Sequence, residues 1–325
     1  MRWASTLLAL LFGTLPVNAV AAVAVPPSPV RSAPPCPQAA MLPPTASAQD
    51  IRITCEIPGP LRLAVETAER EGGSLRFLDV AGWLSTDALR AKKAFADIPG
   101  QPLGWLVLQR DTGFVVPYFT RLADGSVAAF AEATMGSNGV AQALRLSMPR
   151  PATDDERRLL AARNLALSSP RLGCTPAVNT IVRETRFDGR PEIRVYVTSA
   201  WSDETAPLGG FEEFRIDAEG ARILARAPHT RACVNVDPAQ ARSPSGMAVT
   251  DVSATSPTAF HVLLSLQYPA PLHVLTTRNG MLWTVTAGRI GIARPTGEFG
   301  QRLLAWQADV MRRPADAARA EETLP

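Results

Sequence analysis

The chain has 325 residues, of which 46% are hydrophobic and 19% charged, and its formal net charge is +3. This length and composition are typical of a globular protein with one large or two modest domains and a sizeable core. Lys and Arg are interspersed with acids, and no run of five like charges occurs. The sequence therefore lacks the basic stripe that binds nucleic acid or an anionic membrane, and we expect no nucleic-acid partner.

Residues 1–22 have the layout of a secretory signal peptide. Arg2 is followed by the apolar run Leu7–Phe12, and small residues at 19–22 form the expected cleavage region. The alternative is an uncleaved anchor, because the uncharged span 3–30 exceeds the ~20 residues that a membrane helix needs. The short apolar run and Pro16 favour cleavage. Either reading predicts a periplasmic or secreted protein, with no transmembrane span in the mature chain unless this segment is retained.

Residues 23–54 form a tether rich in proline and alanine. Eight prolines occur between Pro26 and Pro44. Proline removes backbone donors and breaks helices, so this composition predicts an extended segment with little to bury.

The four cysteines are Cys36, Cys55, Cys174 and Cys233. In an oxidising compartment an even number suggests two disulfides, for which three pairings are possible. Sequence order favours Cys36–Cys55 and Cys174–Cys233. No pair has the CxxC spacing of a metal site, and we expect neither a metal nor a cofactor.

Residues 55–150 are predicted to form an N-terminal subdomain of helices followed by a meander. Apolar residues recur at helical spacing over 60–71 and 74–96, and Gly72-Gly73 separates these two predicted helices. Strand-rich sequence follows at 105–108, 114–116 and 127–130.

Residues 151–295 are predicted to form a C-terminal antiparallel α+β subdomain. Thr153 and Glu156 have the spacing of a capping box, which predicts a helix to about residue 167. Ile193, Val195 and Val197 alternate with polar residues, which predicts a strand with one buried face. Further strands are predicted at 214–217, 223–224, 261–266, 272–276, 281–285 and 290–292.

Residues 296–325 are predicted to form a C-terminal helix, over about 298–312, and a frayed tail. The overall expectation is an α+β fold in which antiparallel sheets, built from hairpins and meanders, pack against a few helices. A helical stretch followed by two hairpins occurs at 74–134 and again at 153–227, which suggests a duplicated unit.

The common nucleophile, zinc-protease and phosphate-loop motifs do not occur in the sequence. The three histidines are His229, His261 and His273, and none has an evident partner, so a structural role is favoured for each. Glu212 and Glu213 are adjacent on a predicted strand, so they face opposite ways and form no acid–base pair.

Three residues are retained as binding candidates. Asp87 lies on or near an apolar helix beside Ser85 and Thr86, although a helix-capping role for this trio is the favoured alternative. Trp201 lies in a polar loop, where an aromatic ring can contact a ligand or partner. His261 is the third candidate.

Two stretches carry a resemblance to known proteins. They are residues 78–89 (LDVAGWLSTDAL) and 256–266 (SPTAFHVLLSL), the latter followed by 281–285 and 288–290. Together with Cys174 and Cys233 they resemble an uncharacterised group of exported proteins from Gram-negative bacteria. The resemblance covers about 55–295; it implies bacterial export and one continuous architecture, and it transfers no activity.

The leading functional hypothesis is an exported, non-catalytic module that binds a partner protein or an envelope component. One alternative is a periplasmic hydrolase with a carboxylate-based site, which sequence motifs are too weak to exclude. Another is an inhibitor or chaperone-like module. A deep pocket with converging acids would favour an enzyme, whereas a flat or apolar patch would favour binding.

Overall fold

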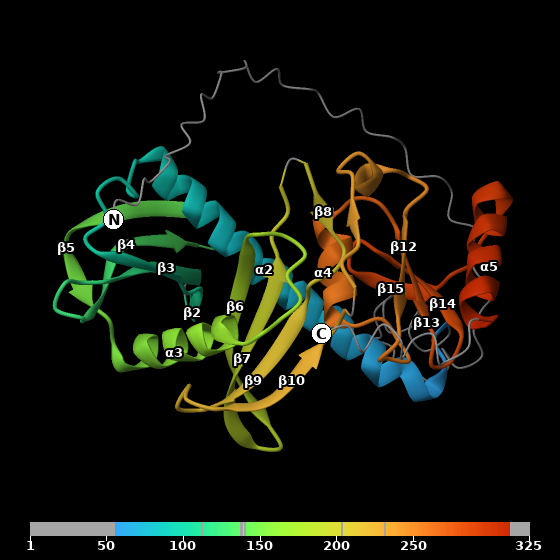
Figure 1. The fold of residues 1–325 in the computed structure, drawn as a ribbon, viewed down its shortest axis with the longest axis horizontal. Coiled ribbons are helices and arrows are strands. Elements are labelled where there is room, and N and C mark those ends of the chain that lie inside the picture. The colour runs from blue at the N-terminus through green and yellow to red at the C-terminus, as the bar shows by residue number, and fades with distance from the viewer. Residues whose placement is uncertain are drawn as a thin grey trace, which may run out of the picture.

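The computed structural model describes residues 56–312 except 112, 137, 138, 140, 203 and 231. The described residues form four α-helices and fifteen strands, which confirms the predicted α+β class (Figure 1). No helix among them is long and apolar enough to cross a membrane. The predicted signal peptide, the tether and the Cys36–Cys55 pair lie outside the described residues, as does the predicted tail after residue 312.

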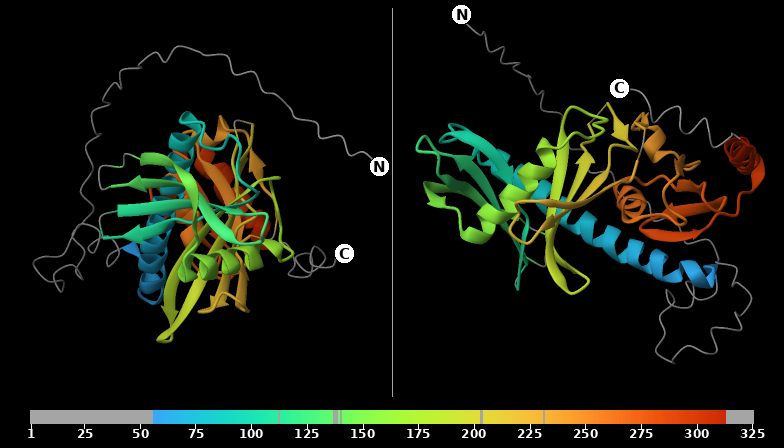
Figure 2. Two further views of the ribbon diagram at one scale, coloured as in Figure 1. Left: turned by 90° about the vertical axis from the view of Figure 1, so that its left-hand side faces the viewer. Right: turned by 60° about the horizontal axis from the view of Figure 1, so that its bottom comes forward.

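The longest element is α2 (Arg62–Ala91), which follows the short η2 (Gly59–Leu61). Its 30 residues span about 45 Å at 1.5 Å per residue. The helix runs past all three larger sheets, as the two views of Figure 2 show. The predicted break at Gly72-Gly73 is therefore wrong. A Cβ atom on Gly72 would lie 2.4 Å from the Cβ of Val262, so this glycine allows another helix to approach closely.

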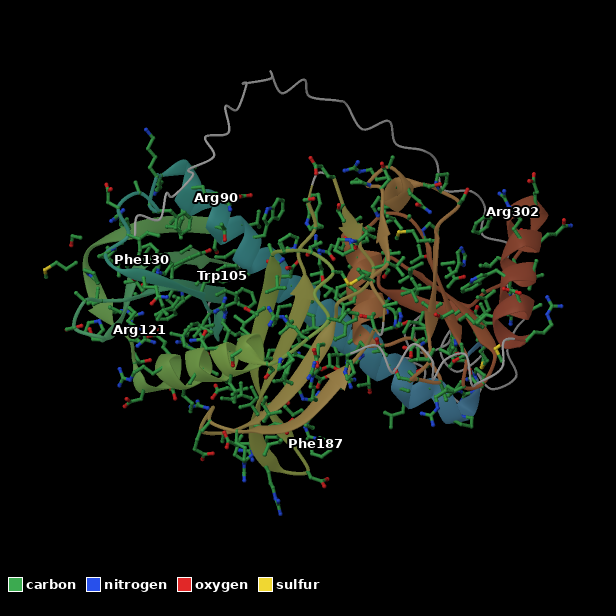
Figure 3. All side chains as sticks on the ribbon, viewed as in Figure 1. Arg90, Trp105, Arg121, Phe130, Phe187 and Arg302 are labelled. Carbon is green, nitrogen blue, oxygen red and sulfur yellow. A yellow bond between two sulfur atoms is a disulfide. The ribbon has the colours of Figure 1, made fainter. Side chains whose placement is uncertain are left out.

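The first sheet lies against the C-terminal half of α2. It contains β1 (Gln101–Trp105), β2 (Leu108–Arg110), β3 (Gly113–Arg121), β4 (Val127–Met135) and β5 (Ala141–Pro151). The strand order is β1-β3-β4-β5, with β2 paired to β3, and every pair is antiparallel. The predicted meander is present, and β5 extends it by a strand that the sequence did not reveal. Apolar side chains such as Phe130 fill the space between this sheet and α2 (Figure 3).

Helix α3 (Asp154–Ser168) joins the first sheet to the second. The capping box at Thr153 and Glu156 is confirmed, since each donates a backbone N–H to the other's side chain. Leu159 and Leu160 of this helix share a hydrophobic cluster with residues of both sheets. One face of α3 thus packs against both sheets, while its other face is exposed.

The second sheet has the order β10-β9-β7-β6, and all its pairs are antiparallel. Its strands are β6 (Val178–Phe187), β7 (Arg190–Ser199), β9 (Glu212–Asp217) and β10 (Ile223–Pro228). The prediction that the strand containing Val195 buries one face only is wrong, because Tyr196, on the opposite face, is 1% exposed. α2 and α4 (Ala259–Gln267) cover that second face, where Tyr196 contacts Glu71 and Phe260.

The third sheet contains β12 (Met247–Asp251), β13 (Leu272–Thr276), β14 (Met281–Thr286) and β15 (Arg289–Ile292). The prediction of a strand at 261–266 is wrong, because these residues lie in α4 (Ala259–Gln267). α4 connects β12 to β13, which form the one parallel pair among the described strands. Residues 259–265 of α4 are all buried, so their sequence shows no helical periodicity. The predicted C-terminal helix is confirmed as α5 (Gly297–Arg312), whose Leu303 packs against β13 and β14.

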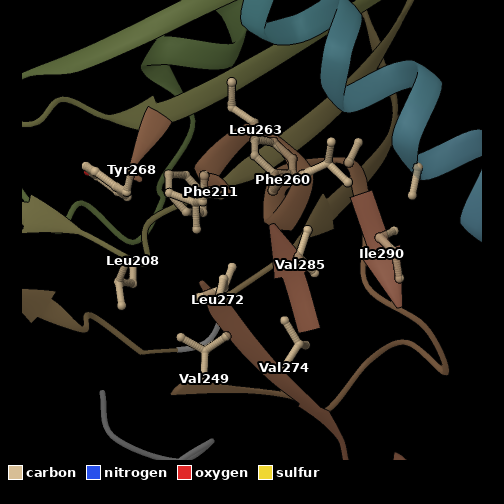
Figure 4. Close-up of a cluster of buried hydrophobic side chains, with 14 of the residues drawn as sticks. Leu208, Phe211, Val249, Phe260, Leu263, Tyr268, Leu272, Val274, Val285 and Ile290 are labelled. Carbon is tan, nitrogen blue, oxygen red and sulfur yellow. The ribbon is translucent and has the colours of Figure 1, made fainter. Parts of the chain in front are cut away.

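The largest hydrophobic cluster joins α2, α4 and the third sheet (Figure 4). It includes Phe260 of α4, whose ring lies 5.3 Å from that of Phe211. α2 contacts elements on both sides of residue 150, and the domain boundaries at 150 and 295 stay predictions.

Candidate functional site

Trp201, one of the three predicted binding residues, lines an open depression in the surface. The depression is shallow, with a volume of about 70 Å³. Two alanines complete a wall formed mainly by Trp201, Pro238, Arg242, Gln267, Tyr268 and Pro269. We refer to these six residues as the Trp201 depression.

Two loops supply one side of the Trp201 depression. Trp201 lies between β7 and β8 (Ala206–Pro207), in a loop closed by a hydrogen bond from Ser202 N–H to the carbonyl of Thr205. Pro238 follows β11 (Asn235–Val236), which pairs antiparallel with β8. The pairing of these two short strands therefore holds both loops at the depression.

The other side comes from η3 (Gln240–Arg242) and from the end of α4. Tyr268 caps α4 by donating its backbone N–H to the carbonyl of Leu264. The backbone N–H of Ala270 in turn bonds the carbonyl of Ala241, which ties the two segments together. The depression thus has a defined frame on each side.

A disulfide braces the loop side of the depression. Cys174 and Cys233 are bonded, with Cα atoms 5.1 Å apart, which confirms that predicted pair. Gly210 packs against this disulfide with φ +73°, and a Cβ atom there would lie 2.9 Å from the sulfur of Cys174. A larger residue would be both strained and obstructed. The sequence Pro207-Leu208-Gly209-Gly210 therefore fits β8 against the disulfide.

The polar side chains of the Trp201 depression are unpaired. Those of Trp201, Arg242, Gln267 and Tyr268 form no hydrogen bond with any residue that the structure describes. Burial raises the pKa of Tyr268 above its usual value, and the negative charge of Asp79 on α2 adds to this effect. The phenol therefore stays protonated, and all four side chains present N–H or O–H donors.

The other predicted binding residues lie elsewhere. Asp87 lies on the half of α2 that packs on the first sheet, where it forms a surface ion pair with Arg90 at 3.5 Å. The favoured capping role is wrong, because α2 continues through Ser85 and Thr86 without interruption. Asp87 therefore neither lines the Trp201 depression nor caps a helix.

His261 is buried inside α4. Its Nδ1 accepts a hydrogen bond from the backbone N–H of Thr258, so it takes part in the cap at the start of that helix. Burial lowers its pKa to about 4; Asp251 opposes this shift and His229 adds to it. A neutral, enclosed imidazole suits a structural role, as favoured from the sequence.

A second group of ionisable residues lies where the second sheet faces α2. We call Glu71, Glu192, Arg194, Tyr196 and Glu213 the Arg194 network. One guanidinium nitrogen of Arg194 lies 3.3 Å from Glu71 and 3.3 Å from Glu213, and another lies 3.1 Å from Glu192. The hydroxyl of Tyr196 donates to Glu71.

The charge state of the Arg194 network suits a structural cross-link. Burial works to raise the pKa of Glu213, but contacts with His229 and Arg194 outweigh it and hold that pKa below its usual value. Glu213 therefore stays ionised at neutral pH. A hydrolase that uses two carboxyls needs one of them protonated. Glu212, in contrast, pairs with Arg226 on the opposite face, which confirms that the two adjacent acids form no pair.

Sequence reasoning named Trp201 as a candidate and considered Glu213, but no pattern pointed to the other residues of either group. Arg242 and Tyr268 lie in segments with no catalytic motif, and Tyr196 was assigned to an exposed face. Among the described residues no group of three or more His, Cys, Asp or Glu is placed to hold a metal ion.

Comparison of the chain with protein-family models, curated protein sequences and solved structures returns no match. The resemblance to exported Gram-negative proteins therefore stays a prediction.

Proposed function

We propose that this chain is an exported, non-catalytic binding protein that takes its ligand in the Trp201 depression. The observation that carries the proposal is the set of four unpaired side-chain donors beside an aromatic wall in one concave site. Ligand sites typically combine apolar and aromatic walls with a few convergent polar groups. Trp201 is 45% exposed, so its ring is open to a partner.

Export is supported by the sequence of residues 1–22 and by the disulfide. Cys174 and Cys233 are 59 residues apart, and such a bond persists in an oxidising compartment. A partner protein or an envelope component is accordingly the ligand we propose. The hydrolase alternative receives less support, because Arg194 contacts all three carboxyl groups of its network, Glu71, Glu192 and Glu213.

The test uses full-length mature protein labelled with ¹⁵N at its tryptophan indoles. Soluble disaccharide-peptide fragments of the bacterial cell wall and a set of proline-rich and acidic peptides are the probes. We expect at least one probe to shift the Trp201 indole resonance saturably, and mass spectrometry to recover that probe intact. Trp201→Ala is expected to weaken its binding about tenfold or more, as for an aromatic anchor.

The matched control is Trp83→Ala. Trp83 lies on α2 and is 54% exposed, so it is an equally accessible indole outside the depression. Its resonance and its substitution should leave binding unchanged. Cleavage of a probe by the protein, or binding that Trp201→Ala does not alter, would contradict the proposal.

A further inference from the structure

We propose that the Trp201 depression binds the free carboxylate end of a peptide, with Arg242 pairing with the carboxylate and the ring of Trp201 covering the residue before it. This inference rests on the proposed function, because it names the chemical class of the ligand at the same site. The group that enters the depression is a chain end with a negative charge and a small terminal residue.

Arg242 is the one charged residue among the eight described residues that line the depression. It ends η3, and its guanidinium forms no hydrogen bond or ion pair with any residue that the structure describes. A guanidinium presents its donors as a planar fork that matches the two oxygens of a carboxylate. The charge inside the depression is therefore positive, and its geometry suits a carboxylate.

The hydroxyl of Tyr268 gives a second, independent indication of a ligand. Tyr268 is 7% exposed, yet its hydroxyl has no hydrogen-bond partner among the described residues, whereas buried polar groups are nearly always hydrogen-bonded. The hydroxyl is not fully enclosed. In Figure 4 the ring of Tyr268 lies at the margin of the hydrophobic cluster, and its hydroxyl end points away from Phe211. Because Tyr268 lines the depression, this end of the ring opens into it and needs an acceptor, which a ligand supplies.

The hydrogen-bonding groups of the depression favour a ligand that accepts. All four polar side chains of the wall offer donors, and only those of Gln267 and Tyr268 also have an oxygen that can accept. An ionised carboxylate only accepts, at about four lone-pair positions. A sugar hydroxyl or a peptide amide would bring donors for which the wall has few acceptors, so the carboxylate is the better-matched group.

The acids around the depression do not neutralise it. Asp79 of α2 is the acid whose charge acts on Tyr268, but a guanidinium nitrogen of Arg76 lies 2.7 Å from its carboxylate and acts on the phenol in the opposite direction. An ion pair, not a free negative charge, therefore lies beside the phenol. Glu204 and Asp237 are exposed in the flanking loops and do not line the depression. The charge within the wall stays positive.

The size of the depression limits the ligand to a chain end. An enclosed cavity of about 150 Å³ holds one benzene molecule. The depression is shallow and measures about 70 Å³, so it accepts a carboxylate and a side chain as small as a methyl group, but not a complete sugar ring. The preceding residue then lies over Trp201, which is 45% exposed and lines the depression with Pro238.

The experiment titrates four N-acetylated dipeptides, to millimolar concentration, into full-length mature protein whose tryptophan indoles carry ¹⁵N. Two end in a free carboxylate, acetyl-L-Ala-L-Ala and acetyl-D-Ala-D-Ala, and the other two are their C-terminal amides. We expect at least one acid to shift the Trp201 indole resonance saturably. Its amide should bind at least about tenfold more weakly, because hydrogen bonds to charged groups are the stronger ones. The L acid represents the end of a partner protein and the D acid the peptide stem of a bacterial cell wall, so the two arms distinguish the sources of one chemistry.

Two variants test the side chains that carry the inference. Arg242→Gln removes the charge, so the affinity for the acid should fall about tenfold, to that of the amide, which should not change. Tyr268→Phe keeps the buried ring and removes the hydroxyl, so the affinity for the acid should also fall about tenfold. The matched control is Arg90→Gln, an exposed arginine on α2 outside the depression, which should leave both affinities unchanged. Far-UV circular dichroism and thermal unfolding confirm that each variant folds as the native chain does.

The opposite results overturn the inference. Equal affinity for an acid and its amide, or an affinity for the acid that Arg242→Gln does not change, means that the depression does not recognise a carboxylate. If the cell-wall fragments or longer peptides shift Trp201 and neither acid does, this inference fails while the proposed function stands. If no probe of either kind shifts Trp201, both fail.

Discussion

The C-terminal half of α2 packs on the first sheet mainly through apolar side chains, whereas its N-terminal half, besides its apolar packing on α4 and the third sheet, also reaches the other two sheets through carboxyl side chains. At the C-terminal end, Leu89 lies in a cluster with Tyr118, Phe130 and several alanines. At the N-terminal end, Glu69 accepts the backbone N–H of Ile290 on β15 at 2.7 Å. Both ends of the helix thus bury apolar side chains, but the N-terminal end also supplies a buried carboxyl group to a strand.

The difference follows from what each end has to cover. The first sheet presents a mainly apolar face to α2, so burial provides most of the stabilisation of this contact. β15 is an edge strand of the third sheet, and its unpaired N–H groups need acceptors. Glu69 supplies one, and Glu71 satisfies Arg194 and Tyr196 on the second sheet. The N-terminal half therefore adds partnered polar groups to its apolar packing.

The largest effect is expected from Arg194→Met, which keeps an apolar stem but removes the guanidinium. Glu71, Glu192 and Glu213 would lose a shared partner in a largely buried site. Breaking a buried ion pair in this way typically costs about 3–5 kcal/mol. Urea unfolding measures the loss.

The control is Arg90→Met at the other end of α2, where an exposed pair with Asp87 should contribute about 0.5 kcal/mol or less. Equal losses in the two variants would remove the distinction between the two ends.

A smaller effect is expected from Gly72→Ala, compared with Gly73→Ala as its neighbour and control. The new methyl on Gly72 would lie 2.6 Å from the carbonyl oxygen of Ala259 as well as against Val262, so α2 and α4 must separate. Overpacking of this kind costs about 1–3 kcal/mol. A Cβ at Gly73 meets nothing within 4 Å. That substitution should therefore stabilise the helix by roughly 0.5–1 kcal/mol.

Thermal unfolding of the two glycine variants checks this prediction. The expected result is a lower midpoint for Gly72→Ala and an equal or higher one for Gly73→Ala. If both variants are stabilised, α4 does not approach α2 as closely as the structure shows. If both are destabilised, the helix is interrupted at this pair, as the sequence pattern had suggested.

The sequence predicted those features that depend on neighbouring residues. The cap at Thr153 needs only Glu156, and the alternation of Ile193, Val195 and Val197 identifies β7 from its own residues. The errors arose where a distant element decides the outcome. Gly72 looked like a helix break because nothing local shows that α4 crosses there.

The same reason explains what was missed at the candidate sites. Tyr196 follows a polar pattern, yet α2 covers it and Glu71 accepts its hydroxyl hydrogen. Trp201 could be chosen because an aromatic residue in a polar loop is unusual by itself. Arg242 and Tyr268 become its neighbours only when η3 and the end of α4 fold together, so no local pattern points to them.

The smallest effect is the difference in unfolding free energy between removing two tyrosine hydroxyls, each of which bonds to one end of α2. The hydroxyl of Tyr196 donates to the carboxylate of Glu71, whereas that of Tyr118 lies 2.8 Å from the neutral hydroxyl of Thr86. Hydrogen bonds to charged groups contribute about 1.5–3 kcal/mol and neutral ones about 0.5–1.5. Tyr196→Phe should therefore cost about 2 kcal/mol and Tyr118→Phe about 1 in urea unfolding. Adding Glu71→Gln to Tyr196→Phe should cost less than the two single losses together, because one interaction links them. A larger loss for Tyr118→Phe would mean that the apolar end of α2 depends on polar contacts more than the charged end does.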